Sequence, residues 1–540
     1  MAAPDTVLTA FAEHARSRPH SPALLLPAGR RHRSGRGGFR AVSYAELSRR
    51  SDALAAGLAA MGLRPGHRAA MLVPPGADFF AVAYALLKTG AVPVLIDPGI
   101  GATNLRVCLR EAAPMAFVAV PRAHTARRAL RWCPSARLLV TVGPRTPGGG
   151  RTLRAVERAG AARLPFVPLP VEDQAVAAIA FTSGSTGVPK GVEYRHSNFL
   201  AQVALLRMLY AVVPGEVSVA TFPPFALLGP LLGLTTVIPR MDPTRPARIN
   251  PERLADAVTT FGASVLFGSP ALLDTVGRWG ARTGRRLAPL RRVISAGAPV
   301  PSQVQRRILD MLPPDAEVCT PYGATEALPV TSIGRELQGI SEPGVCVGRP
   351  VPGVDVAIIP ITDEPLASLA ERVQPGEVGE IVVRGPNVTT TYADRLVATA
   401  AAKLDWDGVT GHRMGDLGYL DDEGRLWFCG RKTQRVQTPS CTLYTSPAEE
   451  IVTAHPAIRR AALVGVGEPG SQRPVICVQL EPGHRPSPEL TAEVLARTAA
   501  HSATAGVDAV LYRKDFPVDI RHNSKIDRAA VARWATRRLR

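Results

Sequence analysis

Hydrophobic and polar residues follow two different periods along the first part of the chain. Residues 43–61 place apolar side chains at helical spacing, and Ser43 is followed three positions later by Glu46, which is typical of a helix N-terminus. Residues 79–90 form a second predicted helix, which ends at a glycine. Short apolar runs at 68–74 and 92–96 flank it and predict buried strands. This β-α-β order predicts an α/β fold with helices covering a sheet.

Further buried strands are predicted downstream, and each runs into a segment of small residues. Residues 176–180 form an apolar run that leads into a loop at 181–191. Residues 263–270 and 292–299 have the same character. In open α/β sheets, ligands bind at the loops that follow the carboxyl ends of the strands. The pattern therefore predicts a ligand site near the ends of these strands.

The composition of the 540 residues is that of a large globular protein. Hydrophobic residues make up 46 %, and at about 100–200 residues per domain the length predicts several structural units. No apolar run reaches the ~18 residues that a membrane-spanning helix needs, so no transmembrane segment is expected. The N-terminus lacks the apolar core of a signal peptide, and the seven cysteines include no Cys-x-x-Cys pair. A reducing, cytoplasmic location is therefore expected.

The net charge of +19 raises the question of a phosphate-bearing partner. It comes from 64 basic and 45 acidic residues, and almost all of the basic ones are arginines dispersed along the chain. Because the arginines are dispersed, a compositional origin is favoured and nucleic acid is not expected as a partner. Lysine is scarce, and two of the few lysines, Lys190 and Lys525, lie in the motifs described next.

The segment after the strand at 176–180 has the composition of a phosphate-binding loop. Glycines let the backbone approach a ligand closely, N–H groups and hydroxyls donate hydrogen bonds to phosphate oxygens, and Lys190 adds a positive charge. Pro189 precedes this lysine, so the loop cannot enter a helix as a Walker loop does. A surface linker rich in Gly and Ser is the alternative interpretation. The loop residues are Thr182, Ser183, Gly184, Ser185, Thr186 and Gly187.

Three later motifs carry side chains that suit the rest of a nucleotide. Tyr322 offers a flat ring for a purine, Thr325 offers a hydroxyl for a phosphate, and Glu326 offers a hard oxygen ligand for Mg²⁺. Asp416 can accept both hydrogen bonds of a ribose diol. Near the C-terminus, Lys525 supplies a point charge for a phosphoryl group. Each has a plainer interpretation, namely a turn residue for the carboxylates and a solvated tail for the lysine.

The order of these motifs resembles the acyl-adenylate-forming enzymes, which include acyl-CoA synthetases, adenylation domains and luciferases. The resemblance implies ATP and Mg²⁺ as cofactors and Lys525, Glu326 and Thr182 as catalytic residues, with Glu326 holding the metal. It also implies a large N-terminal AMP-binding domain of helix-covered β-sheets at residues 1–430 and a small, mobile C-terminal α/β lid at residues 431–540. The implied nucleotide-binding residues are Thr182, Ser183, Gly184, Ser185, Thr186, Gly187, Lys190, Gly297, Ala298, Pro299, Thr320, Tyr322, Gly323, Thr325, Asp416 and Arg431.

An apolar, proline-bent segment at 221–229 is similar to the part of these enzymes that lines the acyl pocket. Adenylation domains for amino acids usually place an aspartate there, whereas this chain has Ala226 and no carboxylate before Asp242. Because a buried ammonium group without a partner is costly, an amino-acid substrate is disfavoured. The resemblance implies a fatty or β-hydroxy fatty acid in a pocket lined by Phe225, Ala226, Phe267 and Ser269.

Two departures from the family pattern concern the acceptor of the acyl group. The hinge position usually holds Asp or Lys and is Thr433 here, and the loop at 437–444 lacks the glycine that shapes the pantetheine tunnel. Several segments resemble instead the β-lactone synthetases of olefin pathways. That resemblance implies that the substrate's own β-hydroxyl attacks the adenylated carbonyl to give a β-lactone. It also implies that other enzymes of a lipid or β-lactone pathway act as partners. His196 and His522 are candidates for the base, with structural or solvated histidines as the plainer interpretation.

Two other functions stay open at this point. A fatty acyl-CoA ligase, or an acyl-AMP ligase that loads a carrier protein, would share the first half-reaction. A catalytically silent protein that binds nucleotide or nucleic acid would make use of the net charge of +19. The presence of Lys190, Glu326, Asp416 and Lys525 favours an enzyme over this last function.

Overall fold

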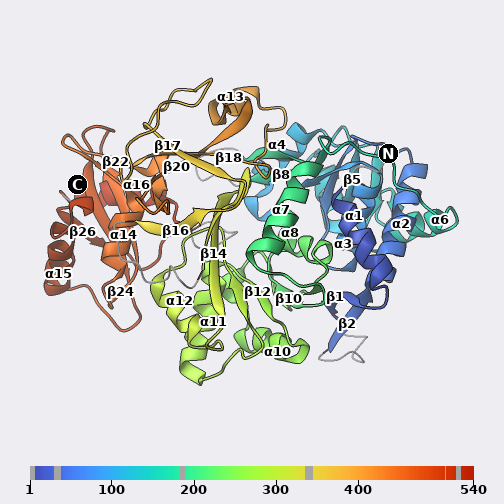
Figure 1. Cartoon of the computed structure of the whole chain (residues 1–540), viewed down its shortest axis with the longest axis horizontal. Helices are drawn as coiled ribbons and strands as arrows, with labels where there is room; N and C mark the ends of the chain where they lie inside the picture. Colours follow the sequence, from blue (N-terminus) through green and yellow to red (C-terminus); the bar gives the residue numbers. More distant parts are fainter. Residues whose placement is uncertain (1–5, 29–37, 183–188, 335–343, 505, 519–524) are drawn as a thin grey trace.

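The computed structural model describes residues 6–28, 38–182, 189–334, 344–504, 506–518 and 525–540. The strands of these residues form four sheets against which helices pack, so the predicted α/β class is confirmed. Figure 1 shows the N-terminal elements at one end of the molecule and the C-terminal elements at the other. Within the described ranges, no helix combines the length and the apolar character that crossing a membrane requires.

The first sheet has seven strands, of which all but the last run parallel. In sheet order they are β7 (Arg151–Thr152), β6 (Leu138–Thr141), β5 (Ala116–Ala119), β3 (Arg68–Leu72), β4 (Val92–Leu95), β8 (Val176–Thr182) and β9 (Lys190–Arg195). The helices of this part of the chain are α1 (Val7–Ser17), α2 (Tyr44–Ala60), α3 (Ala77–Lys88), α4 (Ala102–Ala112), α5 (Pro121–Ala129), α6 (Leu153–Ala161) and α7 (His196–Leu209). The predicted helices and strands between residues 43 and 96 are confirmed, and Ser43 Oγ caps α2 by accepting a hydrogen bond from Glu46 N at 3.1 Å.

A second, longer sheet runs through the centre of the molecule (Figure 1), and one half of it is mainly parallel. The strands of this half are β2 (Phe39–Ser43), β1 (Pro22–Pro27), β11 (Thr235–Val237), β10 (Val217–Ala220), β12 (Val265–Phe267), β13 (Arg292–Ile294) and β14 (Glu317–Ala324). The longer helices between them are α10 (Pro251–Phe261), α11 (Pro270–Thr283) and α12 (Ser302–Leu309), and two single-turn helices lie between β10 and β11. The strands predicted at 263–270 and 292–299 are confirmed as β12 and β13, and each gives way to small residues at its carboxyl end.

The other half of this sheet is antiparallel. In order it holds β15 (Ala327–Ile333), β16 (Val345–Pro350), β21 (Leu426–Arg431), β20 (Val409–Leu420), β18 (Gly379–Arg384) and β17 (Asp355–Ile359), while β19 (Lys403–Trp406) also pairs with β20. The register of β20 and β21 places Asp416 opposite Arg431. Asp416 therefore lies inside a strand, and the interpretation of this residue as a turn aspartate is wrong.

The C-terminal residues build a smaller α/β unit with its own core. Its elements are β22 (Val436–Gln437), β23 (Thr442–Leu443), α14 (Thr445–Thr453), β24 (Ile458–Val466), β25 (Arg473–Leu480), α15 (Pro488–Ala499), β26 (Ala509–Tyr512) and α16 (Arg528–Leu539). Two clusters of buried apolar side chains are made entirely of residues from this unit. The chain thus has the predicted large and small α/β parts, while the boundary at residue 430 and the mobility of the lid stay predictions.

Candidate active site

A cavity of about 2330 Å³ is lined by residues of both long sheets and of the C-terminal unit. Most of the predicted site residues line it, although they come from segments far apart in the sequence. They are Thr182, Lys190, Phe225, Phe267, Ser269, Gly297, Ala298, Pro299, Thr320, Tyr322, Gly323, Thr325, Glu326, Asp416, Arg431 and Lys525. The predicted loop residues Ser183, Gly184, Ser185, Thr186 and Gly187 lie outside the described residues.

Asp416 is the centre of a buried polar cluster in this cavity. One carboxylate oxygen, Oδ2, accepts a hydrogen bond from the Tyr322 hydroxyl at 2.7 Å, and the other, Oδ1, lies 3.0 Å from Arg431 Nε. Burial raises the pKa of Asp416, while the charge of Arg431, the Tyr322 hydroxyl and the charge of Lys525 act against that rise. Apart from its ion pair with Arg431, the buried Oδ1 receives no hydrogen bond from the described residues, so it keeps acceptor capacity that a ribose hydroxyl could use. The cluster therefore fits the sugar of a nucleotide.

We expect Asp416→Asn to weaken ATP binding about tenfold, because the amide carries no charge and accepts fewer hydrogen bonds than the carboxylate. The dissociation constant of ATP, measured by titration calorimetry without the acid substrate, checks this. Asp422→Asn is the matched control, since Asp422 lies in the exposed turn after the same strand. An unchanged ATP affinity in the Asp416 variant would contradict a role in binding the ribose.

The second motif forms a hairpin between β14 and β15, with Thr325 and Glu326 at its turn. Gly323 allows the close approach of the two strands, because a Cβ atom there would lie 2.4 Å from the carbonyl oxygen of Ala327. Glu326 is not a solvated turn residue, since its Oε1 accepts a hydrogen bond from the Tyr392 hydroxyl at 2.7 Å.

Glu326 is the predicted metal ligand, and its surroundings suit Mg²⁺ better than a metal held by protein groups alone. Within the described ranges, no group of three or more His, Cys, Asp or Glu side chains is arranged to hold a metal ion. Mg²⁺ usually binds through one or two carboxylates together with water and substrate phosphates. A single carboxylate at the wall of a nucleotide-sized cavity fits that pattern.

The residues at the two ends of the predicted phosphate loop pair with each other where β8 ends and β9 begins. Thr182 pairs with Lys190 in the register of the two strands, and Thr182 Oγ1 donates to the Lys190 carbonyl oxygen at 3.5 Å. The Lys190 ammonium lies 5.0 Å from the centre of the Tyr392 ring. Lys190, at one end of the loop, therefore lies beside Tyr392, whose hydroxyl bonds to Glu326.

The predicted acyl pocket has an aromatic wall. The rings of Phe225 and Phe267 stack with centroids 4.2 Å apart, and both residues line the cavity. Phe225 belongs to α8 (Pro223–Ala226), a single turn that is followed by α9 (Leu228–Leu231). Ala226 is 1 % exposed, packs into the apolar core and is not among the described residues that line the cavity. Its assignment to the pocket wall is corrected, because successive side chains of a helical turn point in different directions.

Asp242, the first carboxylate after the segment at 221–229, is held by a neighbouring residue. Asp242 lines the cavity, but its Oδ1 accepts hydrogen bonds from Thr244 N at 2.9 Å and from Thr244 Oγ1 at 2.7 Å. These bonds lower the pKa of Asp242 and hold it in a local turn. Ser269, at the end of the pocket, caps α11 by accepting a hydrogen bond from Leu272 N at 3.4 Å. This arrangement suits an uncharged, apolar acyl chain.

The C-terminal unit contributes Lys525 to the cavity, where its positive charge acts on Asp416. Of the two candidate histidines, His522 lies outside the described residues. His196 is 2 % exposed and is not among the described residues that line the cavity, which supports the plainer structural interpretation. Two other histidines, His412 and His501, do line the cavity.

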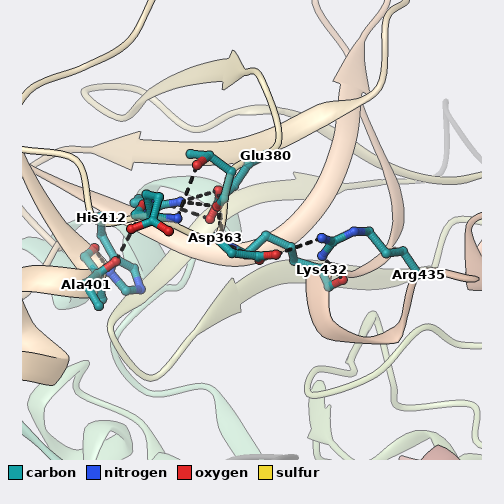
Figure 2. Close-up of polar contacts among 10 residues, drawn as sticks. Asp363, Glu380, Ala401, His412, Lys432 and Arg435 are labelled. Carbon is teal, nitrogen blue, oxygen red and sulfur yellow. Dashed lines mark hydrogen bonds and ion pairs between the residues drawn. The ribbon is translucent and has the colours of Figure 1, made fainter. Parts of the chain in front are cut away.

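An ion-pair network with a buried centre lies beside the predicted hinge residue Thr433 (Figure 2). Glu380 Oε2 lies 2.7 Å from Arg413 Nη2 and 3.2 Å from Lys432 Nζ. The Glu380 and Arg413 side chains are only 1 % and 3 % exposed. Asp363 extends the network to Arg435, whose Nη2 donates to Asp363 Oδ2 at 2.9 Å. This hinge network, made of Asp363, Glu380, Arg413, Lys432 and Arg435, fixes the residues on both sides of Thr433.

Two residues that line the cavity, His412 and Tyr392, belong to none of the predicted motifs. His412 lies four residues before Asp416 in β20, and a register irregularity between them breaks the strand alternation that could have indicated it. Tyr392 also lines the cavity, and the only local signal for it is the run of threonines that precedes it at 389–391.

Comparisons with known proteins identify the family of the chain. Residues 11–393 match the family of AMP-binding enzymes. An olefin beta-lactone synthetase of Xanthomonas campestris pv. campestris is 51 % identical in an alignment that is 540 positions long and covers 96 % of each chain. One of Stenotrophomonas maltophilia is 49 % identical over 99 % of each chain.

Solved structures show the same fold. The amide bond synthetase McbA of Marinactinospora thermotolerans has a TM-score of 0.80 at 24 % identity, over 98 % of this chain and all of that one. ATP-bound MatB of Rhodopseudomonas palustris also has a TM-score of 0.80, at 21 % identity over 99 % of this chain and 100 % of that one. By its sequence and its fold, the chain belongs to the family of AMP-binding enzymes, as an acyl-adenylate-forming ligase.

Proposed function

We propose that this enzyme activates a β-hydroxy fatty acid with ATP and then closes a β-lactone. The observation that carries the proposal is the identity of about half of all residues, over nearly the whole chain, with two enzymes named olefin beta-lactone synthetases. The aromatic, uncharged wall at Phe225 and Phe267 supports an apolar acyl chain.

In the first half-reaction, a carboxylate oxygen of the acid bonds to the α-phosphorus of ATP as the bond to pyrophosphate breaks. The protein contributes chiefly positioning and charge. Asp416 and Arg431 would hold the ribose, and Lys190 and Lys525 would supply positive charge to the phosphoryl groups. Mg²⁺ bound at Glu326 would neutralise charge on the phosphates.

In the second half-reaction, the β-hydroxyl oxygen of the substrate bonds to the activated carbonyl carbon, the bond from that carbon to the AMP oxygen breaks, and the hydroxyl proton is released. No thiol enters this step. The loop at 437–444, which would shape a pantetheine tunnel, folds into the β22–β23 hairpin, and none of the described residues 437–443 lines the cavity. This supports an acceptor that is already part of the substrate.

The product distinguishes this proposal from its alternatives. We expect that incubation with MgATP and a long-chain β-hydroxy acid gives AMP, pyrophosphate and a product lighter than the acid by one water, with or without CoA. Mass spectrometry of the organic extract checks this. The same acid without its hydroxyl group is the matched control, since it can be adenylated but cannot close a ring.

Other products would favour the alternatives. A thioester formed only when CoA or a carrier protein is present would identify an ordinary acyl ligase. Salt-sensitive binding to nucleic acid without ATP consumption would identify a catalytically silent binding protein. If the product is a β-lactone, other enzymes must supply the β-hydroxy acid and consume the lactone. The cytoplasmic location of the protein stays a prediction.

A further inference from the structure

Tyr392 lies between the two predicted phosphate-side groups, Lys190 and Glu326. It precedes α13 (Leu396–Ala402) and forms an isolated antiparallel bridge with Val192 of β9, the strand that begins at Lys190. The tyrosine side chain is 6 % exposed and lines the cavity. It therefore contacts the phosphate-loop hairpin on one side and the turn of the β14–β15 hairpin on the other.

The hydroxyl of Tyr392 acts on the carboxylate. It donates a hydrogen bond to Glu326 Oε1 at 2.7 Å. Hydrogen bonds to a charged acceptor are stronger than neutral ones, so this contact fixes one oxygen of Glu326 and leaves the other for a ligand.

The ring of Tyr392 makes a cation–π contact with Lys190. Lys190 Nζ lies 5.0 Å from the ring centroid, within the range in which an ammonium is attracted to an aromatic face. Lys403 Nζ lies 5.9 Å from the same centroid. One rigid side chain thus fixes the separation of a cation and an anion that are both expected to face the phosphates.

The main chain of Glu326 is also held by hydrogen bonds. The Glu326 carbonyl oxygen accepts hydrogen bonds from Thr389 N at 2.8 Å and from Thr389 Oγ1 at 3.1 Å. Thr389 is in turn bonded by the buried Lys403, whose Nζ donates to the Thr389 carbonyl oxygen and, at 3.4 Å, to Thr389 Oγ1. The segment from 389 to 392 therefore anchors Glu326 at both its main chain and its carboxylate.

We propose that Tyr392 is a positioning residue that orients Glu326 for the metal through its hydroxyl and Lys190 for the triphosphate through its ring. The inference rests on the proposed function in one respect, namely that Glu326 is the Mg²⁺ ligand. It predicts that the two contacts can be removed one at a time, with different consequences.

Tyr392→Phe keeps the ring and removes only the hydroxyl. We expect the Mg²⁺ concentration needed for half-maximal ATP affinity to rise about tenfold, because Glu326 loses the bond that orients it, while ATP affinity without metal stays unchanged. Calorimetric titration of the full-length protein with ATP at several Mg²⁺ concentrations, without the acid, measures both quantities. Tyr392→Leu removes the ring as well, and we expect it to weaken metal-free ATP binding in addition.

Tyr512→Phe is the matched control, because it removes a hydroxyl that bonds to Thr491 in the C-terminal unit, away from the cavity. Thermal melting of every variant separates loss of fold from loss of orientation. An unchanged Mg²⁺ requirement in folded Tyr392→Phe overturns the inference. If Glu326→Gln is equally indifferent to Mg²⁺, the metal assignment in the proposed function fails instead, whereas the identity of the organic product is judged separately by its mass.

Discussion

Replacing Lys525 by alanine is expected to slow acyl-adenylate formation by about 10²–10³-fold, while the affinity for ATP changes little. The side chain lines the cavity, and its charge acts on Asp416, so it belongs to the nucleotide side of the site. A positive group aimed at charge that develops on a phosphoryl group stabilises the transition state more than the bound nucleotide. Pyrophosphate exchange into ATP gives the rate, and calorimetric titration gives the affinity.

Lys514→Ala is the matched control for this prediction. Lys514 is an exposed lysine of the same C-terminal unit and is not among the described residues that line the cavity. The Lys514→Ala substitution removes the same charge from the chain and should leave the rate of pyrophosphate exchange unchanged. If Lys525→Ala exchanges pyrophosphate as fast as the unmodified enzyme, Lys525 is not the catalytic lysine; if ATP affinity falls in parallel with the rate, its role is binding.

Glu380→Gln is expected to destabilise the protein by about 3–5 kcal/mol, because it leaves the buried Arg413 without its carboxylate partner and removes the nearer of the two carboxylates beside Lys432. Glu380 is the carboxylate that Arg413 and Lys432 share in the hinge network (Figure 2). Desolvation makes an unpaired buried charge far more costly than an unpaired surface charge. Urea denaturation followed by tryptophan fluorescence checks this, since Trp406 and Trp427 are buried in the same half of the sheet.

An exposed ion pair supplies the comparison. Asp508→Asn breaks the contact between Arg473 and Asp508, whose side chains are 48 % and 59 % exposed, and should change the stability by about 0–1 kcal/mol. A similar small effect for Glu380→Gln would mean that the hinge network is solvated and does not hold the two parts of the chain together.

Local patterns in the sequence were enough to predict the helices and strands whose signals lie within a few residues. The helix α2 follows from apolar spacing and a serine cap, and β3, β4 and β8 follow from short apolar runs, because helical and strand periods are written within a few residues. The sequence also indicated that small residues after β12 and β13 would face a ligand, since parallel strands end at one edge of a sheet. The chemical groups of the nucleotide site were therefore predictable one by one.

Which of these groups meet, and which contacts hold them in place, depends on how the whole chain folds. Asp416 faces Arg431 because of the register between β20 and β21, and a register is set by packing of the whole sheet rather than by either strand alone. Tyr392 contacts Glu326 across 66 residues, and Lys432 reaches Glu380 across 52. Ala226 turned into the core while its neighbour Phe225 faced the cavity. Contacts between single residues so far apart leave no periodic pattern in the sequence, so their existence depends on the folded chain.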